Sequence, residues 1–270
     1  MNKLHEAQFE LLKKTINILD QNKIVYWLAY GSVLGAVRHN GFIPWDDDVD
    51  IYINGKDYKK FQSLFINGEI DGIRLDDYKL CDQYPFTFPK LIDASTKLIE
   101  KRFEKTGYIS GVYIDVFPLF EISKNPVMRR MEYFFQYFCY AVVESHYCDY
   151  ERYSVWMKII GKTLKLVPAK KAQELLYKKY MYGFTNNAII LCEPLQFNDD
   201  SIHYAKHFRL TKKHKFESIE VNIPGDYEGY LVGQYGDYME LPPIDKRVPI
   251  HNFKYVEFSD GTSMGVGVNE

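Results

Sequence analysis

The sequence predicts a mixed α/β or α+β fold with a helical annex. Over residues 1–124, short runs with strand patterning alternate with amphipathic helical segments and turn residues, which is typical of a sheet covered by helices. Over residues 125–210, apolar and aromatic side chains recur at three and four positions, which indicates long helices instead. Strand patterning returns in residues 211–270, so we expect this last segment to return to the core.

Local patterning places each element in turn. A stripe of leucine and isoleucine predicts a helix over residues 3–21, and the apolar run 24–30 predicts a strand after it. Ser32 is then placed to cap a short helix over residues 33–39. The remaining expected elements are a strand at 48–53, a helix at 56–66, strands near 72–76, 86–93, 97–101 and 112–117, a strand from 216, a short helix starting at 224–226 and a loop at 235–243.

Composition excludes several classes of protein. The 270 residues carry a formal net charge of -2, so no global basic field is present to coat a nucleic acid. The cysteines form no C-x-x-C pair, and we expect them to be reduced and mostly buried, which favours a cytoplasmic protein. The charged N-terminus is unlike a signal peptide, and no apolar run reaches the roughly 18 residues of a spanning helix, so we expect a soluble or peripheral protein. The four cysteines are Cys81, Cys139, Cys148 and Cys192.

An acidic strand carries the clearest chemical signal. In the run from Asp48 to Ile53, polar and apolar residues alternate, so Asp48 and Asp50 share one face while Val49 and Ile51 are buried on the other. The two carboxylates then stand roughly 7 Å apart along the strand. Because such anions repel each other, a fold that holds them together usually binds a cation as well. Paired aspartates of this kind suit Mg²⁺ or Mn²⁺.

Two other interpretations of this run are weaker. A calcium loop beginning at Asp46 would need glycine at its sixth position and a bidentate glutamate at its twelfth, where this sequence has Ile51 and Asp57. A solvated acidic turn is the plainer alternative. The interleaved Val49 and Ile51 argue against it, because a strand anchored in a core holds its acidic face fixed.

Asp115 is a third candidate carboxylate. It is the only charged residue in the apolar run 112–118, and such residues are seldom buried unless they are paired or bind a metal. A neighbouring strand would bring it beside Asp48 and Asp50. Three carboxylates around Mg²⁺ form the arrangement used for phosphoryl and nucleotidyl transfer. The alternative role for Asp115 is to cap a helix or a turn.

Other motifs narrow the chemistry further. Gly31 and Ser32 follow the first predicted strand, so the backbone N–H groups that begin the next helix could hold a phosphate. The chain contains no P-loop and no G-x-G-x-x-G, which argues against Walker-type ATPases and Rossmann dehydrogenases. His203 and His207 have helical zinc-ligand spacing but lack the glutamate of H-E-x-x-H, so ordinary surface histidines are the better interpretation.

Residues 152–180 are strongly basic, with eight basic side chains against the single acid Glu174. Apolar residues are interleaved among them. One interpretation is a solvated helix face over a core, and the other is an interfacial helix on an anionic membrane or lipid-linked acceptor. The basic residues are Arg152, Lys158, Lys162, Lys165, Lys170, Lys171, Lys178 and Lys179.

These strings resemble the LicD family of the polymerase-β-type nucleotidyltransferase superfamily, to which fukutin-related proteins are similar. The most specific string runs from Gly31 to Ile51 and contains Gly-Phe-Ile-Pro-Trp-Asp-Asp-Asp-Val-Asp-Ile. Three further strings support the resemblance but are less specific: Lys90–Asp93 with Thr96, Ile114–Pro118, and Tyr235–Pro243 followed by Arg247 and His251.

The resemblance implies a mixed-sheet nucleotidyltransferase-like core that transfers a phospho-alcohol, such as phosphocholine, phosphoethanolamine, ribitol phosphate or glycerol phosphate. The donor would be the CDP-activated alcohol, the acceptor a hydroxyl of a cell-surface glycan or of its lipid-linked precursor, and the leaving group CMP. Lipopolysaccharide, teichoic acid and capsule polysaccharide are such glycans. Asp48, Asp50 and Asp115 match the metal-binding and catalytic carboxylates. Substrate-binding positions are matched by Gly31, Ser32, Arg38, His39, Lys90, Arg247 and His251.

Together with this resemblance, the sequence predicts a cytoplasmic phosphotransferase at the inner face of the membrane that depends on Mg²⁺ or Mn²⁺. A sugar hydroxyl would attack in line, with Asp115 or a metal-bound oxygen assisting its deprotonation. The insertion of the Arg38–Trp45 loop between Gly31 and Asp48 argues against direct nucleotide transfer to a protein or an antibiotic. Two alternatives stay open: a nucleotidyltransferase that uses an NTP and releases pyrophosphate, and a non-catalytic glycan- or lipid-binding module.

Overall fold

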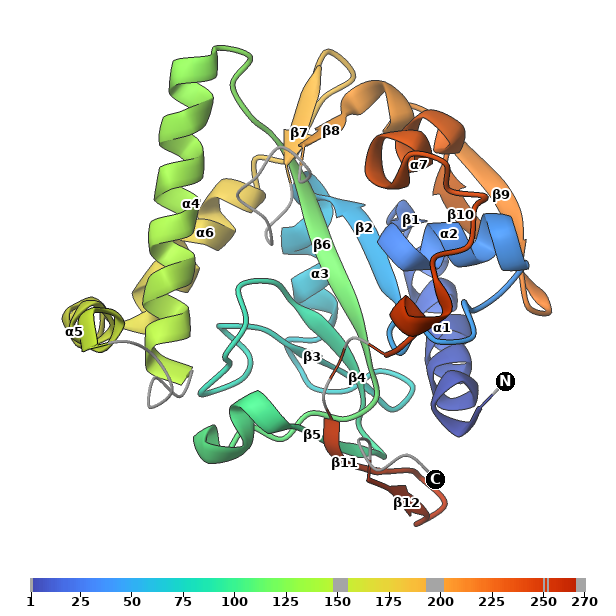
Figure 1. The fold of residues 1–270 in the computed structure, drawn as a ribbon, viewed down its shortest axis with the longest axis horizontal. Coiled ribbons are helices and arrows are strands. Elements are labelled where there is room, and N and C mark those ends of the chain that lie inside the picture. The colour runs from blue at the N-terminus through green and yellow to red at the C-terminus, as the bar shows by residue number, and fades with distance from the viewer. Residues whose placement is uncertain (1, 148–154, 193–201, 250, 252, 266–270) are drawn as a thin grey trace.

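A computed structural model describes residues 2–147, 155–192, 202–249, 251 and 253–265 (Figure 1). Its centre is a mixed sheet in the strand order β1-β2-β6-β4-β3. Strands β2 and β6 are parallel, while the pairs β1–β2, β4–β6 and β3–β4 are antiparallel. The bounds are β1 Tyr26–Leu28, β2 Asp50–Asn54, β3 Ile73–Asp76, β4 Lys90–Asp93 and β6 Tyr113–Glu121. This arrangement confirms the predicted mixed α/β fold.

Strand β6 is the central element of the sheet. Every residue from Tyr113 to Phe120 is buried, and only the terminal Glu121 is exposed. A strand covered on both faces is expected to be a nearly continuous apolar run, and the sequence of β6 departs from this only at Asp115 and Pro118 before its end. A buried aspartate inside such a strand needs a partner, and that partner lies on a neighbouring strand.

Helices on the N-terminal side hold the sheet and the loop before β2. Helix α1 begins after Asn2, whose side chain accepts a hydrogen bond from the N–H of His5, and its buried leucines and isoleucines pack on the core. Helix α2 connects β1 with the acidic loop, and α3 follows β2 through a short 3-10 turn. The bounds are α1 Lys3–Gln21, α2 Tyr30–His39, the turn η1 Gly55–Asp57 and α3 Tyr58–Leu64.

Three helices form the annex, on the side of the sheet away from α1 (Figure 1). Helix α6 packs against the core. The Gln173 side-chain amide donates hydrogen bonds to the carbonyls of Tyr84 and Phe86. The Tyr177 and Tyr180 rings are fully buried. After these helices, β7 pairs with the end of β6, and β8 pairs with β7. The bounds are α4 Pro126–Tyr147, α5 Val155–Leu164, α6 Ala169–Tyr180, β7 Ile190–Cys192 and β8 Ile202–Tyr204.

The last part of the chain packs against two separate parts of the core, first beside β1 and α2 and then beside β5. A hairpin packs beside β1 and α2, and α7 begins at Asp226, whose carboxylate accepts from the N–H of Gly229. The final strands join β5 in a separate sheet. The bounds are β5 Lys97–Glu100, η2 Lys101–Thr106, η5 Ala205–Phe208, β9 Thr211–Phe216, β10 Ile219–Pro224, α7 Tyr227–Tyr235, η6 Ile244–Lys246, β11 Phe253–Glu257 and β12 Ser263–Met264.

The expected elements occur close to their predicted positions, with two instructive differences. Strand β9 was not predicted, because five of its six residues are charged or polar and hide its pairing with β10. The prediction that Ser32 caps a helix was wrong. Helix α2 begins at Tyr30 after Ala29, and the Ser32 hydroxyl instead accepts the N–H of Asp50 at 3.0 Å. Ser32 thus links the helix to the acidic strand.

The cysteine and membrane predictions can be compared only in part with the structure. Cys81, Cys139 and Cys192 are free thiols, the last two buried, while Cys148 lies outside the described residues. In the described part of the chain, no helix is both long enough and apolar enough to cross a bilayer. The division of the chain at residues 124 and 210 stays a prediction.

Replacing Ser32 with alanine tests the link between α2 and β2. Ser32→Ala leaves the N–H of the buried Asp50 without its acceptor, so the free energy of unfolding should fall by about 1–3 kcal/mol. Urea denaturation followed by circular dichroism measures this loss. The matched control is Ser63→Ala on the exposed side of α3, which should change stability by less than about 0.5 kcal/mol. Equal losses in the two variants would contradict the assignment.

Candidate functional site

Strand pairing brings the acidic residues together. The parallel register of β2 and β6 sets Asp50 directly beside Asp115, and the antiparallel register of β4 sets Lys90 on the other side of Asp115. Lys90 Nζ lies 2.6 Å from Asp115 Oδ1, and the two side chains are only 2% and 7% exposed. Three strands that are distant in sequence therefore place two carboxylates and one ammonium group in a row across the sheet.

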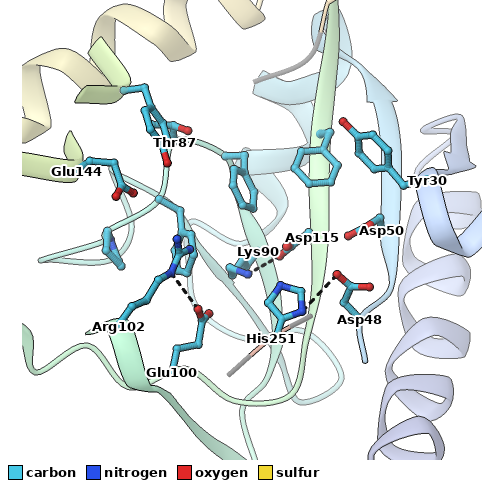
Figure 2. Close-up of a pocket in the computed structure, with 15 residues that line it drawn as sticks. Tyr30, Asp48, Asp50, Thr87, Lys90, Glu100, Arg102, Asp115, Glu144 and His251 are labelled. Atoms are coloured by element: carbon cyan, nitrogen blue, oxygen red, sulfur yellow. Dashed lines mark hydrogen bonds and ion pairs between the residues drawn. The ribbon is translucent and has the colours of Figure 1, made fainter. Parts of the chain in front are cut away.

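These residues face a cavity of about 320 Å³ above the sheet. Figure 2 shows Asp48, Asp50 and Asp115 turned toward the same hollow, with the His251 ring beside Asp48. The transferase hypothesis requires Asp115 to face the same cavity as Asp48 and Asp50, and it does so. The lining residues are Tyr30, Asp48, Asp50, Pro85, Phe86, Thr87, Phe88, Lys90, Glu100, Arg102, Asp115, Phe117, Tyr140, Glu144 and His251.

A second cavity of about 590 Å³ adjoins the first. The two share Tyr30, Asp48 and Asp50, so these residues stand between two hollows. The second cavity also contains Gly31 at the start of α2 and Arg38 near its end. Its other lining residues are Leu34, Ile43, Trp45, Asp46, Tyr235, Asp237, Tyr238, Glu240, Leu241, Pro242, Pro243, Lys246 and Val248.

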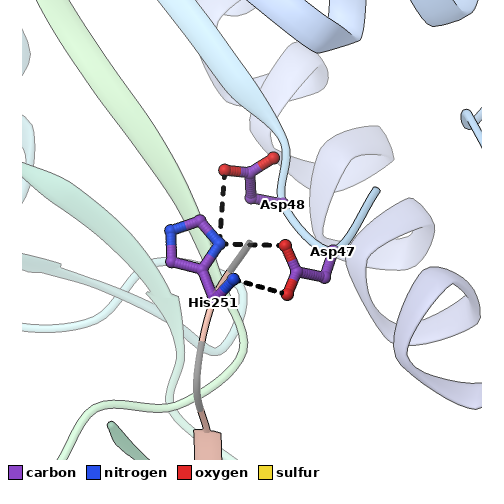
Figure 3. A group of neighbouring side chains, drawn as sticks. All are labelled: Asp47, Asp48 and His251. Carbon is purple, nitrogen blue, oxygen red and sulfur yellow. Dashed lines mark hydrogen bonds and ion pairs between the residues drawn. The ribbon is translucent and has the colours of Figure 1, made fainter. Parts of the chain in front are cut away.

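The acidic loop before β2 is fixed by its neighbours. Asp47 accepts the backbone N–H of His251 at 3.0 Å through Oδ2, and its Oδ1 lies 2.9 Å from His251 Nδ1 (Figure 3). His251 Nδ1 also lies 3.6 Å from Asp48. From the other side, Gln8 of α1 donates to the carbonyl of Asp47 at 2.8 Å. The loop is therefore clamped between the first helix and the last segment of the chain.

Burial and crowding raise the pKa values of the carboxylates. Burial raises the pKa of Asp46 to about 8, and the charges of Asp48 and Asp47 add to this effect. Burial also raises the pKa of Asp48 to about 6, although the charge of His251 opposes the shift. For Asp50, burial and then the charges of Asp48 and Asp115 hold the pKa well above its ordinary value.

The pKa values of Asp115 and His251 are shifted by burial and by neighbouring charges as well. Burial raises the pKa of Asp115, while the ion pair with Lys90 opposes the rise. For His251, burial lowers the pKa, but the hydrogen bond to Asp47 and the charges of Asp48 and Asp47 outweigh burial, so the pKa is raised overall. Lys90 is held among the rings of Phe86 and Tyr113, with its Nζ 3.5 Å from the Tyr113 centroid. The site thus contains more negative than positive groups.

This donor set fits a hard divalent cation. Asp48, Asp50 and Asp115 offer carboxylate oxygens, which Mg²⁺ prefers, and the repulsion that raises their pKa values is what a bound cation would relieve. Among the described residues, potential ligand atoms of Asp47, Asp48 and His251 also lie within 4.8 Å of one another. Since both oxygens of Asp47 contact His251, we interpret Asp47 and His251 as residues that hold Asp48 in position and not as metal ligands. The metal role of the three aspartates stays a prediction.

Only some of the remaining predicted site residues line the two cavities. A side chain at Gly31 would collide with the Asp46 carboxylate, which explains the glycine there. Arg38 lines the second cavity, where it donates to the carbonyls of Tyr238 and Glu240 at 2.9 and 3.2 Å. His39 and Arg247 instead contact Trp45, with the Arg247 guanidinium 5.4 Å from the ring centroid. The described linings of the two cavities include neither His39 nor Arg247.

The histidines His203 and His207 have separate partners. His203 Nε2 lies 3.2 Å from the Tyr52 hydroxyl, and His207 Nδ1 lies 2.8 Å from Asp226. Both side chains are buried, so the expectation of ordinary surface histidines was wrong about their exposure. They stabilise the packing of η5 and α7 beside β2.

Sequence reasoning missed several residues of the site. Glu100 and Arg102 pair at 3.3 Å on the cavity wall, and Glu144 reaches the wall from α4 (Figure 2). Asp47 was passed over because it lies on the opposite side of the chain from Asp46 and Asp48. The i, i+2 spacing of Glu100 and Arg102 at the end of a strand was the only local signal, and it does not reveal which cavity they reach.

Comparisons with known proteins identify a similar domain and similar chains. Residues 23–149 match the model of the LicD/FKTN/FKRP nucleotidyltransferase domain. The chain is 25% identical over 259 residues to the lipopolysaccharide cholinephosphotransferase LicD of Haemophilus influenzae, covering 87% of this chain and 92% of that protein. It is 26% identical over 121 residues to the human ribitol 5-phosphate transferase FKRP, covering 45% of this chain and 21% of that protein. The corresponding figures for mouse FKRP are 40% over 121 residues, 45% and 22%.

The fold and the acidic site define a nucleotidyltransferase-like enzyme with a mixed sheet. More particularly, residues 23–149 match the LicD-type domain model, and the chain is homologous to LicD cholinephosphotransferase and to FKRP, which confirms the predicted recognition. The protein is a phosphotransferase.

Without a bound cation, the crowded carboxylates should make stability depend on pH. The pKa values of Asp46 and Asp48 lie above their ordinary value of 3.8, at about 8 and about 6, so the folded state holds protons that the unfolded state has released. In EDTA, the free energy of unfolding should therefore fall as pH rises from about 4 to about 8, by roughly 1 kcal/mol per pH unit. Urea denaturation at pH 5, 6.5 and 8 measures the slope.

The variant Asp46→Asn provides the control for this pH dependence. It removes a carboxylate whose pKa is raised to about 8, so the slope between pH 6 and pH 8 should become shallower. Mg²⁺ added to the unmodified protein at pH 8 should raise the midpoint by mass action. A free energy of unfolding that increases between pH 5 and pH 8 in EDTA would contradict the crowding.

Proposed function

We propose that the protein transfers a phospho-alcohol, of which phosphocholine is the leading candidate, from a CDP-activated donor to a hydroxyl of a cell-surface glycan or of its lipid-linked precursor, with release of CMP. The observation that carries this proposal is the convergence of Asp48, Asp50 and Asp115 on one cavity beside Lys90. The relative that spans nearly the whole chain is a lipopolysaccharide cholinephosphotransferase, which favours phosphocholine and a glycan acceptor.

Two adjoining cavities suit a reaction with two substrates. Because Asp48 and Asp50 line both cavities, a donor in one and an acceptor in the other would meet at these carboxylates. Holding both reactants in this way converts a bimolecular encounter into a reaction within one complex. Lys90 and Arg102 supply positive charge to the smaller cavity, where a pyrophosphate would need it.

The reaction then has a defined balance of bonds. The oxygen of the acceptor hydroxyl forms a bond to the phosphorus that carries the alcohol, and the bond from this phosphorus to the bridging oxygen breaks. CMP departs with that electron pair, and the hydroxyl proton passes to the carboxylate of Asp115. Burial favours this role, because it raises the pKa of Asp115 toward that of an effective base.

The other residues of the site hold the reactants. Lys90 pairs with Asp115 and thereby orients its carboxylate, and His251 is held by Asp47 at the edge of the cavity. The Phe86 and Phe88 rings offer flat surfaces on which a base could stack. A Mg²⁺ or Mn²⁺ ion held by Asp48, Asp50 and Asp115 would supply charge neutralisation at the transferred phosphate. Gly31, Ser32, Arg38, His39, Arg247 and His251 are proposed as substrate-binding residues on the family pattern.

A carboxylate substitution tests the catalytic assignment. Asp48→Asn keeps the size of the side chain but removes its charge, so CMP release from CDP-choline with a glycan acceptor should fall by more than about 100-fold. Because the Asp48 side chain is 18% exposed, the variant should stay folded, which circular dichroism checks. The matched control is Asp71→Asn, the same change at an exposed turn residue whose φ of 51° suits asparagine. Full turnover by Asp48→Asn in saturating Mg²⁺ would remove this residue from the mechanism.

A ligand panel distinguishes the donor classes. CDP-choline, CDP-ethanolamine, CDP-ribitol, CDP-glycerol and CTP are each added with and without Mg²⁺, and the unfolding temperature is followed. A CDP-alcohol should raise it by several degrees and more strongly with Mg²⁺, because a ligand that binds only the folded state stabilises it by mass action. A response to CTP alone, with pyrophosphate as the product, would favour the NTP-dependent alternative. The absence of any response would favour the non-catalytic module.

A cytoplasmic position at the inner face of the membrane is also part of the proposal. It rests on the expected lipid-linked precursor and on the free thiols of the described cysteines. Fractionation of cells that express the protein checks it.

A further inference from the structure

We propose that helices α4 and α5 form a docking surface for an anionic phospholipid bilayer. On α4, the side chains of Val127, Met131, Phe134 and Phe138 are 70%, 62%, 73% and 41% exposed. Their spacing of four, three and four residues places them on one stripe of the helix. Exposed apolar surface of this extent usually marks an interaction site. The inference goes beyond the proposed function and relies on it only for the presence of a lipid-linked acceptor.

Helix α5 has the composition of an interfacial helix. Trp156, Ile159 and Ile160 are 75%, 50% and 53% exposed, and Gly161 is the buried residue on the side that packs. Lys158 and Lys162, spaced by four residues, share a separate stripe. The helix contains no acidic residue. Apolar residues on one arc and lysines beside them are typical of helices that lie in the plane of an anionic membrane.

The acidic residues of α4 are turned away from this surface. Glu132 accepts from Lys179 of α6 at 2.9 Å, and Glu144 lines the cavity of the candidate site. Arg130, in contrast, is exposed near the start of the helix. The exposed sides of α4 and α5 are therefore apolar and basic, which complements the negative potential of phosphatidylglycerol-type headgroups.

The structure narrows the basic region that the sequence indicated. Lys171 and Lys178 pair with Glu174, and Lys179 pairs with Glu132, so these side chains of α6 are engaged within the protein. Arg152 lies outside the described residues. The exposed lysines next to apolar residues are those of α5, together with Lys165 just after it.

The position of α4 connects this surface with the candidate site. Tyr140 and Glu144 of α4 line the cavity that contains Asp48 and Asp115, and Figure 2 shows Glu144 there. The residues of the apolar stripe are exposed on the same helix. In Figure 1, α5 projects outward beside α4, on the side away from α1. A bilayer bound at this face would hold a lipid-linked acceptor close to the cavity.

Charge favours a bilayer over a second copy of the chain. In a twofold dimer through this face, the lysines of α5 would meet the same lysines of the other copy, which is unfavourable. The ten residues of α5 span only about 15 Å as a helix, so it would lie on the membrane and not cross it.

Vesicle binding tests the surface with the full-length protein and without any donor. The protein should sediment with phosphatidylglycerol-containing vesicles and remain free with phosphatidylcholine vesicles. Lys158→Gln with Lys162→Gln should weaken binding about 30-fold, because each lysine near an anionic surface contributes about fivefold. Trp156→Glu with Ile160→Glu should abolish binding, since both changes place charge on the apolar arc.

Matched variants and a second measurement complete the test. Lys56→Gln with Lys59→Gln and the single change Ile66→Glu alter exposed residues around α3 and should bind vesicles like the unmodified protein. CMP release with a soluble glycan acceptor should be unchanged in the α5 variants. Equal binding to both vesicle types, or a dimer by light scattering that the α5 variants dissociate, would overturn the proposal. Vesicle binding without any CMP release would overturn the proposed function alone.

Discussion

The structure depends on the parallel pairing of β2 with β6, which places Asp50 beside Asp115 in a buried part of the sheet. Two carboxylates this close cannot both be charged without compensation, because the interior screens their repulsion poorly. Lys90, paired with Asp115 from the adjacent strand, supplies one positive charge, and His251 supplies another near Asp48. The surplus of negative charge is the physical reason to expect a cation, and it ties the stability of the metal-free protein to the chemistry of its site.

The loop before β2 lies between the two cavities, and contacts from both ends of the chain hold its conformation. The Asp46 carbonyl lies 2.7 Å from His5 Nε2, and the His5 ring stacks on Phe42 at a centroid distance of 4.4 Å. The loop then continues into Asp47, which holds His251. Because its acidic side chains are fixed on one side by α1 and on the other by the C-terminal segment, the loop can form a wall shared by two cavities. The loop thus contributes Ile43, Trp45 and Asp46 to the wall of the second cavity.

Helix α4 has two different faces, and this links catalysis with location. Its inner face contributes Glu144 to the cavity and packs Val142 and Val143 into the core. Its outer face carries exposed apolar side chains such as Phe134. Exposure of these side chains to water contributes no hydrophobic stabilisation to the fold. A helix that only covered a sheet would be polar on its outer side. The retained apolar stripe is explained if a membrane surface covers it, and the phosphotransferase would then meet its acceptor where that acceptor is anchored.

The sequence by itself determined the mixed α/β class, the helical annex and the acidic strand, because helical and strand periodicities and the Gly31–Ile51 string are local. It could not determine that Ser32 serves β2, that Asp47 holds His251, or that Glu100 and Glu144 reach the cavity. These contacts join residues 18 to 204 positions apart or depend on which face of an element is covered. Strand order and register, which only the tertiary structure decides, turned separate aspartates into one site, since side chains distant in sequence meet only when neighbouring strands align.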